Sequence, residues 1–193
     1  MNNNNIVIKR VMSHVNIAKH FIRIYEKEIY NVVDSICYKL LQGNKILIFG
    51  NGGSAAAAQH IAGEFVNRFL FDRPAIPAIA LSTDTSVMTA ISNDSNYENV
   101  FSRQVESLVK LHDVCIGIST SGNSENVYNG LKTALENGSY IVTFLGNDGG
   151  KISEIEGHNF IVPSNETPRI QECHILLAHI MCELIERKMY GKT

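Results

Sequence analysis

The stretch K-I-L-I-F-G-N-G-G-S-A-A-A-A occupies residues 45–58 and decides the fold class. Residues 45–49 form a short apolar run, which is typical of a parallel strand buried on both faces. The chain then turns through the glycine-rich segment 50–54 into an alanine-rich stretch that predicts the start of a helix. A buried strand that leads through a tight turn into a helix is the basic unit of an α/β fold.

Four further apolar runs of strand length follow at 75–81, 114–118, 140–145 and 159–162, with helical patterns between them. This alternation predicts a three-layer αβα sandwich built on a mostly parallel, five-stranded sheet. A chain of 193 residues with 45% hydrophobic content is long enough for one sizeable core. We therefore expect a single domain over residues 1–193.

Helices are predicted at both ends of this unit. Apolar residues at three- and four-residue spacing predict a long amphipathic helix over 14–42, about 40 Å in length, preceded by a frayed segment 1–13. Such a helix would overhang the domain and pack against another subunit; two shorter helices that cover the same domain are the alternative. The last helix, over 168–189, is apolar nearly all round, which predicts burial by the domain and by a neighbouring copy.

The composition argues against several classes of function. The 17 basic and 19 acidic residues give a net charge of −2 without a polybasic run, so nucleic-acid and membrane-surface binding are disfavoured. The four cysteines show no CxxC spacing, which indicates reduced thiols and no cysteine metal site. The asparagine-rich N-terminus lacks the apolar core of a signal peptide, and no later apolar run reaches spanning length. We expect a soluble, cytoplasmic protein.

Ligands of open α/β sheets bind at the carboxyl ends of the strands, where two loops stand out. The glycine turn 50–54 lets a ligand approach the backbone at a helix start. A dinucleotide fingerprint fits poorly because Ala55 fills the third glycine position, and a nucleotide P-loop fails because no lysine follows. A site for a small anion or polar ligand remains, beside the plainer alternative of a tight turn.

The loop S-T-S-G-N-S at 119–124 offers four hydroxyls and a glycine at a predicted helix start. Neutral donors in this position can surround a phosphate without lysine or magnesium. The alternative is an ordinary helix cap, but a cap needs one hydroxyl rather than four. The loop therefore favours phosphate.

Histidine and glutamate residues supply the candidate chemistry. His60 and Glu64 stand at i, i+4 on the helix after the glycine turn, a spacing that suits a metal pair or an acid/base pair, although a solvated pair is common. His179 lies in the most apolar helix, where a hydrogen-bonded core histidine is more usual than a ligand. We assign His174 and His158 structural roles.

Several motifs together resemble one family. They are 50–54 (GNGGS), 80–84 (ALSTD), 92–94 (SND), 100–104 (VFSRQ), 118–124 (ISTSGNS), 148–151 (DGGK) and 169–172 (RIQE) with a histidine eight residues after Gln171. Over about residues 43–186 the chain resembles the phosphoheptose, or sedoheptulose-7-phosphate, isomerases of the SIS (sugar isomerase) superfamily. This resemblance implies a flavodoxin-like fold, a homotetramer and a role in bacterial heptose synthesis for lipopolysaccharide or capsule.

The resemblance also implies roles for single residues. It makes Glu64 and His179 the acid/base pair that works through an enediol. It implies a zinc ion bound by His60, Glu64, Gln171 and His179. It assigns substrate binding to Asn51, Gly52, Gly53, Ser54, Asn93, Asp94, Ser119, Thr120, Ser121, Ser124 and Gln171. One departure is Ala57, where family members often carry an aspartate, so rate, metal affinity or sugar preference could differ.

Two questions stay open at this level. His179 can ligate zinc or shuttle a hydroxyl proton, but its zinc-bound nitrogen cannot do both. Related SIS proteins act as assembly factors for the replication initiator or as sugar-phosphate sensors, and retention of all four metal-site residues favours the enzyme. Gln171 and His179 are eight residues apart on one predicted helix, about 12 Å along its axis. We therefore expect them to reach one zinc from different copies of the chain at a subunit interface, and we expect Glu64 and His179 of one site to come from different chains as well.

Overall fold

A computed structural model describes residues 5–191 of the chain. Its strands are β1 (Ile46–Gly50), β2 (Ala78–Ala80), β3 (Val114–Ser119), β4 (Tyr140–Leu145) and β5 (His158–Ile161). Its α-helices are α1 (Ile6–Leu41), α2 (Gly53–Val66), α3 (Thr85–Asp94), α4 (Ser102–Leu108), α5 (Glu125–Glu136) and α6 (Thr167–Tyr190). Two short 3₁₀ helices, η2 (Tyr97–Asn99) and η3 (Lys151–Glu154), complete the order.

The five strands form one parallel sheet in the order β2-β1-β3-β4-β5. The predicted α/β sandwich is therefore confirmed. In the register of the central pair, Gly50 of β1 lies opposite Ile118 of β3. The glycine turn and the serine loop consequently leave neighbouring strands at the same edge of the sheet.

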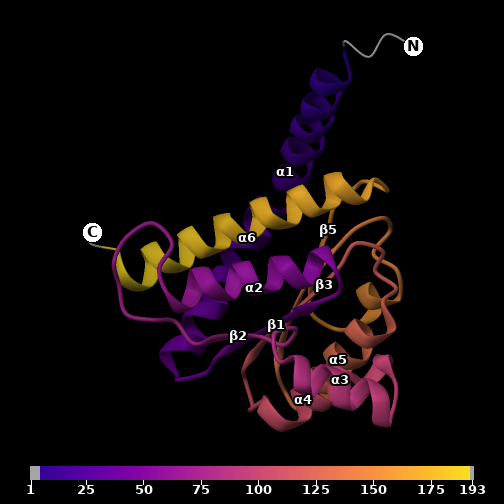
Figure 1. Ribbon diagram of the computed structural model, residues 1–193. Coiled ribbons are helices and arrows are strands. Elements are labelled where there is room, and N and C mark those ends of the chain that lie inside the picture. The colour runs from indigo at the N-terminus through magenta and orange to yellow at the C-terminus, as the bar shows by residue number, and fades with distance from the viewer. Residues whose placement is uncertain (1–4, 192–193) are drawn as a thin grey trace.

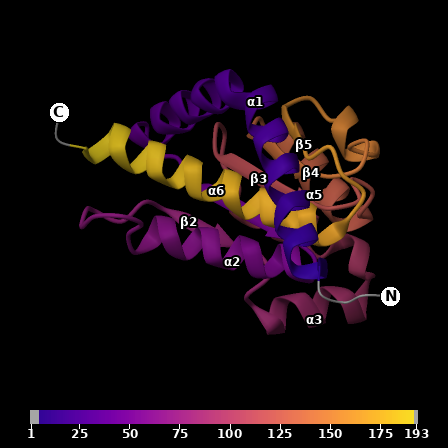
Figure 2. The same ribbon diagram turned by 90° about the horizontal axis from the view of Figure 1, so that it is seen from above.

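Helices cover both faces of the sheet (Figure 1), and α1, α6 and α2 lie together over one of them (Figure 2). The apolar side chains of strand β1 alternate between the two faces of the sheet. Ile46 and Ile48 pack in the core that includes α1, α2 and α6, whereas Leu47 and Phe49 pack in the core that includes α4 and α5. All four side chains are fully buried, as the continuous apolar run predicted.

Strand β2 is shorter than the predicted run 75–81. Pro77 has no N–H to give to the ladder, so the regular strand begins only at Ala78. The carbonyl of Pro77 still accepts a hydrogen bond from the N–H of Ile46 at 2.9 Å. The proline thus marks the start of an edge strand and does not interrupt one.

Helix α1 is one continuous helix of 36 residues, so the two-helix alternative is wrong. It begins at Ile6, eight residues before the predicted start, and the prediction that residues up to 13 are frayed is wrong for residues 6–13; residues 1–4 lie outside the described part. The first turns project beyond the rest of the chain (Figure 1) and expose Ile6, Val7, Ile8, Val11 and Met12. That these side chains pack against another subunit stays a prediction.

Asp113 fastens the amino ends of β1 and β3 together. Its carboxylate is 1% exposed and accepts hydrogen bonds from the backbone N–H groups of Lys45 (2.9 Å) and Lys110 (2.8 Å) and from the Lys45 ammonium group. Burial by itself would raise the pKa of Asp113, but the hydrogen bonds from Lys45 and Lys110 outweigh it and hold the pKa below its ordinary value.

Asp113→Asn should lower the free energy of unfolding at pH 7 by about 2–3 kcal/mol, because charge-assisted hydrogen bonds in a buried site are lost. A depressed pKa means that the carboxylate stabilises the fold fully above its unfolded-state pKa of about 3.9, and that this stabilisation is lost as the pH falls through the lower folded-state value. Urea unfolding at several pH values should show the wild-type advantage shrinking below about pH 4.

The matched control is Asp34→Asn, which removes an exposed carboxylate paired with Lys188. This control should change stability by less than about 1 kcal/mol at either pH. The assigned role would be contradicted if Asp113→Asn lost as much free energy of unfolding, relative to the wild type, at the lowest pH at which the protein stays folded as it loses at pH 7.

Candidate active site

The glycine turn between β1 and α2 lets α6 approach the backbone of the turn closely. Gly52 has a φ of +53°, a conformation that favours glycine. A Cβ on Gly53 would overlap the side-chain amide of Gln171 on α6. The small residues that predicted a close approach to a ligand also allow a close approach of α6.

Asn51 at this turn is held by a reciprocal amide pair. Its Nδ2 donates to Oδ1 of Asn126 at 2.7 Å, and Nδ2 of Asn126 donates back to its Oδ1 at 2.9 Å. The Tyr97 hydroxyl donates to the same Oδ1 at 3.1 Å. Sequence reasoning missed Asn126 and Tyr97, because nothing local in the sequence links them to residue 51.

The serine loop gathers three hydroxyls after β3. The Oγ of Ser119 lies 3.1 Å from that of Ser124 and 3.5 Å from that of Ser121. Ser124 stands at the N-cap of α5 but makes no side-chain cap hydrogen bond. The capping alternative therefore does not account for these hydroxyls, which face one another at the start of a 12-residue helix.

Gly122 fixes the shape of this loop. Its φ is +68°, and a Cβ there would overlap the backbone carbonyl of Gly149. Thr120 completes the loop, and its carbonyl accepts a hydrogen bond from Nδ2 of Asn147 at 2.9 Å. The loop is thus held against the segment that follows β4.

His60, Glu64 and His179 come together within one chain. Their ligand atoms all lie within 4.8 Å of one another, with the two Nε2 atoms 2.9 Å apart and Nε2 of His60 3.4 Å from the Glu64 carboxylate. His179 is half-buried at this cluster and is not a core histidine. The expectation that Glu64 and His179 lie on different copies is wrong, because the packing of α2 on α6 already joins them.

The electrostatics of the cluster favour neutral imidazole at His179. Burial lowers the pKa of His179, the neighbouring His60 lowers it further, and the Glu64 carboxylate opposes both effects. Two imidazole nitrogens and one carboxylate are a donor set that zinc commonly takes in catalytic sites, where three protein ligands leave a position for substrate. The residues present therefore fit a zinc ion.

A buried ion pair holds the end of α2 against α6. The side chains of Arg73 and Glu186 are each 1% exposed and lie 3.0 Å apart. Arg73 donates to the carbonyl of Glu64 at 2.8 Å, and Glu186 accepts the backbone N–H of Phe69 at 2.9 Å. The Phe69 ring lies 5.3 Å from the ring of His179. Sequence reasoning missed this pair; a glutamate within an apolar helix was its one signal.

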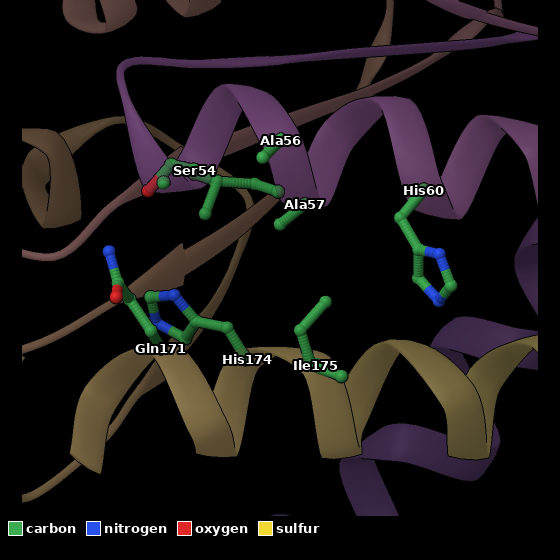
Figure 3. Close-up of a pocket in the computed structure, with 9 residues that line it drawn as sticks. Ser54, Ala56, Ala57, His60, Gln171, His174 and Ile175 are labelled. Atoms are coloured by element: carbon green, nitrogen blue, oxygen red, sulfur yellow. The ribbon is translucent and has the colours of Figure 1, made fainter. Parts of the chain in front are cut away.

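The other predicted site residues lie apart from the cluster. Gln171 sits two turns away on α6, beside Gly53, and lines a cavity of about 310 Å³ between α2 and α6 together with Ser54 and His60 (Figure 3). Asn93 and Asp94 end α3 on the opposite face of the sheet, exposed and hydrogen-bonded to each other at 2.8 Å. Their roles in substrate binding stay predictions.

The four cysteine thiols lie inside the folded domain. Cys37, Cys115, Cys173 and Cys182 are free and buried. Burial raises the pKa of each thiol, to about 12 for Cys115, so these thiols are unreactive. Within residues 5–191, no helix combines the length and the apolar character that crossing a membrane requires.

The fold and the two loops define an SIS domain, and residues 12–146 match the SIS domain family. Sequence comparison with known relatives shows which group of SIS domain proteins the chain resembles. The chain is 54% identical over 173 residues to the phosphoheptose isomerase of Aquifex aeolicus, an alignment that covers 90% of this chain and 91% of the relative. It is 49% identical over 168 residues to that of Clostridium acetobutylicum, with 87% and 86% covered.

Two solved structures of phosphoheptose isomerases have the same fold as this chain. The phosphoheptose isomerase GmhA from Neisseria gonorrhoeae superposes with a TM-score of 0.87 at 39% identity, covering 93% of this chain and 96% of that one. The phosphoheptose isomerase from Francisella tularensis gives a TM-score of 0.92 at 28% identity, with 97% and 100% covered. The chain belongs to the phosphoheptose isomerase family of SIS domain proteins.

Glu186→Ala should lower the free energy of unfolding by about 3–5 kcal/mol, because it leaves the Arg73 guanidinium buried without its partner. Glu183→Ala on the same helix is the matched control, since Glu183 pairs with an exposed Arg187, and it should cost less than about 1 kcal/mol. Denaturant unfolding followed by circular dichroism measures both. Equal small losses would show that the buried pair does not hold α2 to α6.

Proposed function

We propose that this protein is a sugar-phosphate isomerase that converts D-sedoheptulose 7-phosphate to D-glycero-D-manno-heptose 7-phosphate. The observation that carries the proposal is the carboxylate of Glu64 beside two histidines, in a chain that also keeps the serine loop of its family. The product would serve heptose synthesis for lipopolysaccharide or capsule in the bacterial cytoplasm.

Glu64 is the base in this scheme. It takes a proton from carbon 1 of the ketose, the carbonyl oxygen at carbon 2 gains a proton, and an enediol forms. Glu64, whose carboxyl proton exchanges with solvent at this stage, then delivers a proton to carbon 2 while the hydroxyl at carbon 1 loses its own, which leaves the aldose. Carbon and oxygen protons balance, so the reaction needs no redox cofactor.

His60, His179 and Glu64 would hold one zinc ion, and Gln171 would complete the set. When bound, zinc polarises the substrate carbonyl and offsets the negative charge that develops on its oxygen. Of the histidines, His60 is the more exposed, with 48% of its side chain accessible. If His179 does not bind the metal through Nε2, that nitrogen is free to carry the hydroxyl proton between the two oxygens.

The serine loop would bind the phosphate. Ser119, Ser121 and Ser124 offer hydroxyl donors, and the start of α5 adds backbone N–H groups and the positive end of the helix dipole. Neutral donors suit a phosphate that must leave again with the product.

Gln171 reaches the zinc from a neighbouring copy in this proposal. Within one chain it lies about 12 Å along α6 from His179, at the far end of the cavity. The exposed apolar turns of α1 supply a surface for association, and a homotetramer with active sites at its subunit interfaces would join Gln171 of one copy to His60, Glu64 and His179 of another.

Glu64→Gln should lower kcat by about 10²–10⁴-fold with the fold and the oligomer unchanged, since an amide keeps the size but cannot accept a carbon-bound proton. The assay is incubation with sedoheptulose 7-phosphate and zinc, followed by detection of the aldose phosphate. Glu183→Gln, an exposed glutamate of α6, is the control and should keep the full rate. A sensor or assembly factor would show no turnover even in the wild type.

Ser119→Ala combined with Ser121→Ala should raise KM for the sugar phosphate about 10–100-fold, because two donors to a charged phosphate are lost. The melting temperature should change little, since Ser121 is exposed and the Ser119 hydroxyl faces other hydroxyls. Steady-state kinetics and thermal unfolding separate the two effects. A large fall in melting temperature with KM unchanged would support a structural role.

Hybrid oligomers test the shared site. Co-expression of Glu64→Gln with Gln171→Ala should restore part of the activity, because some sites then combine Glu64 from one copy with Gln171 from another. Co-expression of Glu64→Gln with His179→Ala should restore none, because these residues lie in one chain and every site keeps one defect. Activity in the second hybrid, or its absence from the first, would contradict the arrangement.

A further inference from the structure

The cavity between α2 and α6 contains a buried polar atom that the proposed mechanism does not use. His174 is 2% exposed and lines this cavity with Ala56, Ala57 and Ile175 (Figure 3). Its Nδ1 atom is fully buried and has no hydrogen-bond partner among the described residues. Sequence reasoning treated His174 as structural, and only its position in the fold distinguishes it.

The other ring nitrogen fixes the chemical state of His174. Nε2 lies 2.9 Å from the backbone carbonyl of Leu145, and a carbonyl can only accept, so Nε2 carries the hydrogen. Burial lowers the pKa of His174 to about 4, with the hydrogen bond to Leu145 opposing it, so the ring is neutral at physiological pH. A neutral ring protonated at Nε2 has a lone pair at Nδ1, which therefore acts as an acceptor.

The protein side of the cavity offers little to meet this acceptor. Of the residues that line the cavity, Ser54 and Gln171 carry donor groups, but neither makes a hydrogen bond with Nδ1. Ala56 and Ala57 of α2 have no polar side-chain atoms, and the ring of Phe144 lies 6.0 Å from that of His174. Buried polar atoms without partners cost free energy, and ligand sites are a common place for them. The partner that fits an acceptor in an uncharged, partly apolar cavity is an O–H group.

The position of the cavity identifies the donor. Its lining runs from Gly53, Ser54 and Gln171 at the glycine turn to His60, which belongs to the cluster with Glu64 and His179 (Figure 3). An open-chain polyol phosphate offers several hydroxyls along its length. We propose that this cavity is a hydroxyl-binding subsite and that Nδ1 of His174 accepts a hydrogen bond from one hydroxyl of the bound sugar phosphate. The inference rests on the proposed function for its choice of ligand.

Such a subsite distinguishes a ligand group that donates a hydrogen bond from one that can only accept. A hydroxyl at the bound position is accepted, whereas a carbonyl or carboxylate oxygen would face the Nδ1 lone pair and be repelled, and a deoxy carbon would leave it unpaired. His174 is therefore a specificity residue for polyol phosphates, separate from the groups that move protons.

Two substitutions separate this role from a structural one. Glutamine carries its amide Nε2 the same number of bonds from the backbone as the histidine Nε2, so His174→Gln can keep the bond to Leu145 while it places no acceptor at the position of Nδ1. Asparagine carries Oδ1 at the position of Nδ1, so His174→Asn can keep the acceptor and lose the bond to Leu145. Their effects on binding and on stability should run in opposite directions.

Calorimetric titration of the zinc-loaded oligomer with sorbitol 6-phosphate, a polyol phosphate without a carbonyl, tests the subsite without turnover. His174→Gln should weaken binding about tenfold, which corresponds to about 1.4 kcal/mol. His174→Asn should stay within about threefold of wild type although it melts at a lower temperature. Inorganic phosphate, which lacks the hydroxyls, should compete equally well with all three proteins.

Equal affinity of wild type and His174→Gln, or a loss that follows melting temperature across both variants, would overturn the subsite. If the variants do not fold, the ¹⁵N signal of Nδ1 in the wild type decides, since it shifts when the lone pair accepts a hydrogen bond. It should move on addition of sorbitol 6-phosphate but not of inorganic phosphate. A signal that does not move at saturating sorbitol 6-phosphate would overturn the proposal. Turnover of sedoheptulose 7-phosphate by the wild type tests the proposed function independently of all these results.

Discussion

Helix α2 packs closely against α6, and the arrangement of the candidate catalytic and metal-binding residues depends on this contact. Gly53 and Ala57 are small enough to let α6 approach, so that Gln171 meets the glycine turn and His174 borders the cavity. One end of the contact joins His60 and Glu64 to His179. The buried pair of Arg73 and Glu186 fixes that end by tying the carbonyl of Glu64 and the backbone of Phe69 to the same helix.

The parallel sheet supplies the second half of the site. Because β1 and β3 are neighbours in register, the glycine turn and the serine loop emerge side by side. Backbone and hydroxyl donors in both loops are neutral. Lys151 contacts the serine loop through its backbone N–H, which donates to Oδ1 of Asn123, and its ammonium group pairs with Glu125. The edge can therefore bind an anion through hydrogen bonds and the dipole of α5. In the proposed mechanism, residues of α2 and α6 transfer the proton.

Features encoded within a few residues could be predicted from the sequence, and features that depend on tertiary packing could not. The strands follow from continuous apolar runs. Strand β2 begins later than its apolar run because Pro77 has no N–H to donate to the ladder. The i, i+4 pair of His60 and Glu64 follows from helical spacing. The meeting of His179 with that pair, and the amide pair of Asn51 with Asn126, depend on how helices far apart in sequence pack.

The central claim is that a carboxylate moves a proton between two adjacent carbons. The measurement that tests it most directly is isomerisation of sedoheptulose 7-phosphate in D₂O, with the aldose phosphate recovered after many turnovers and examined by NMR or mass spectrometry. Transfer through an enediol on Glu64 exchanges the proton with solvent, so deuterium should appear at carbon 2 of the product. Product that forms at the full rate yet carries no deuterium at carbon 2 would contradict the account, in which the Glu64 side chain, 23% exposed, exchanges its proton with solvent between the two transfers.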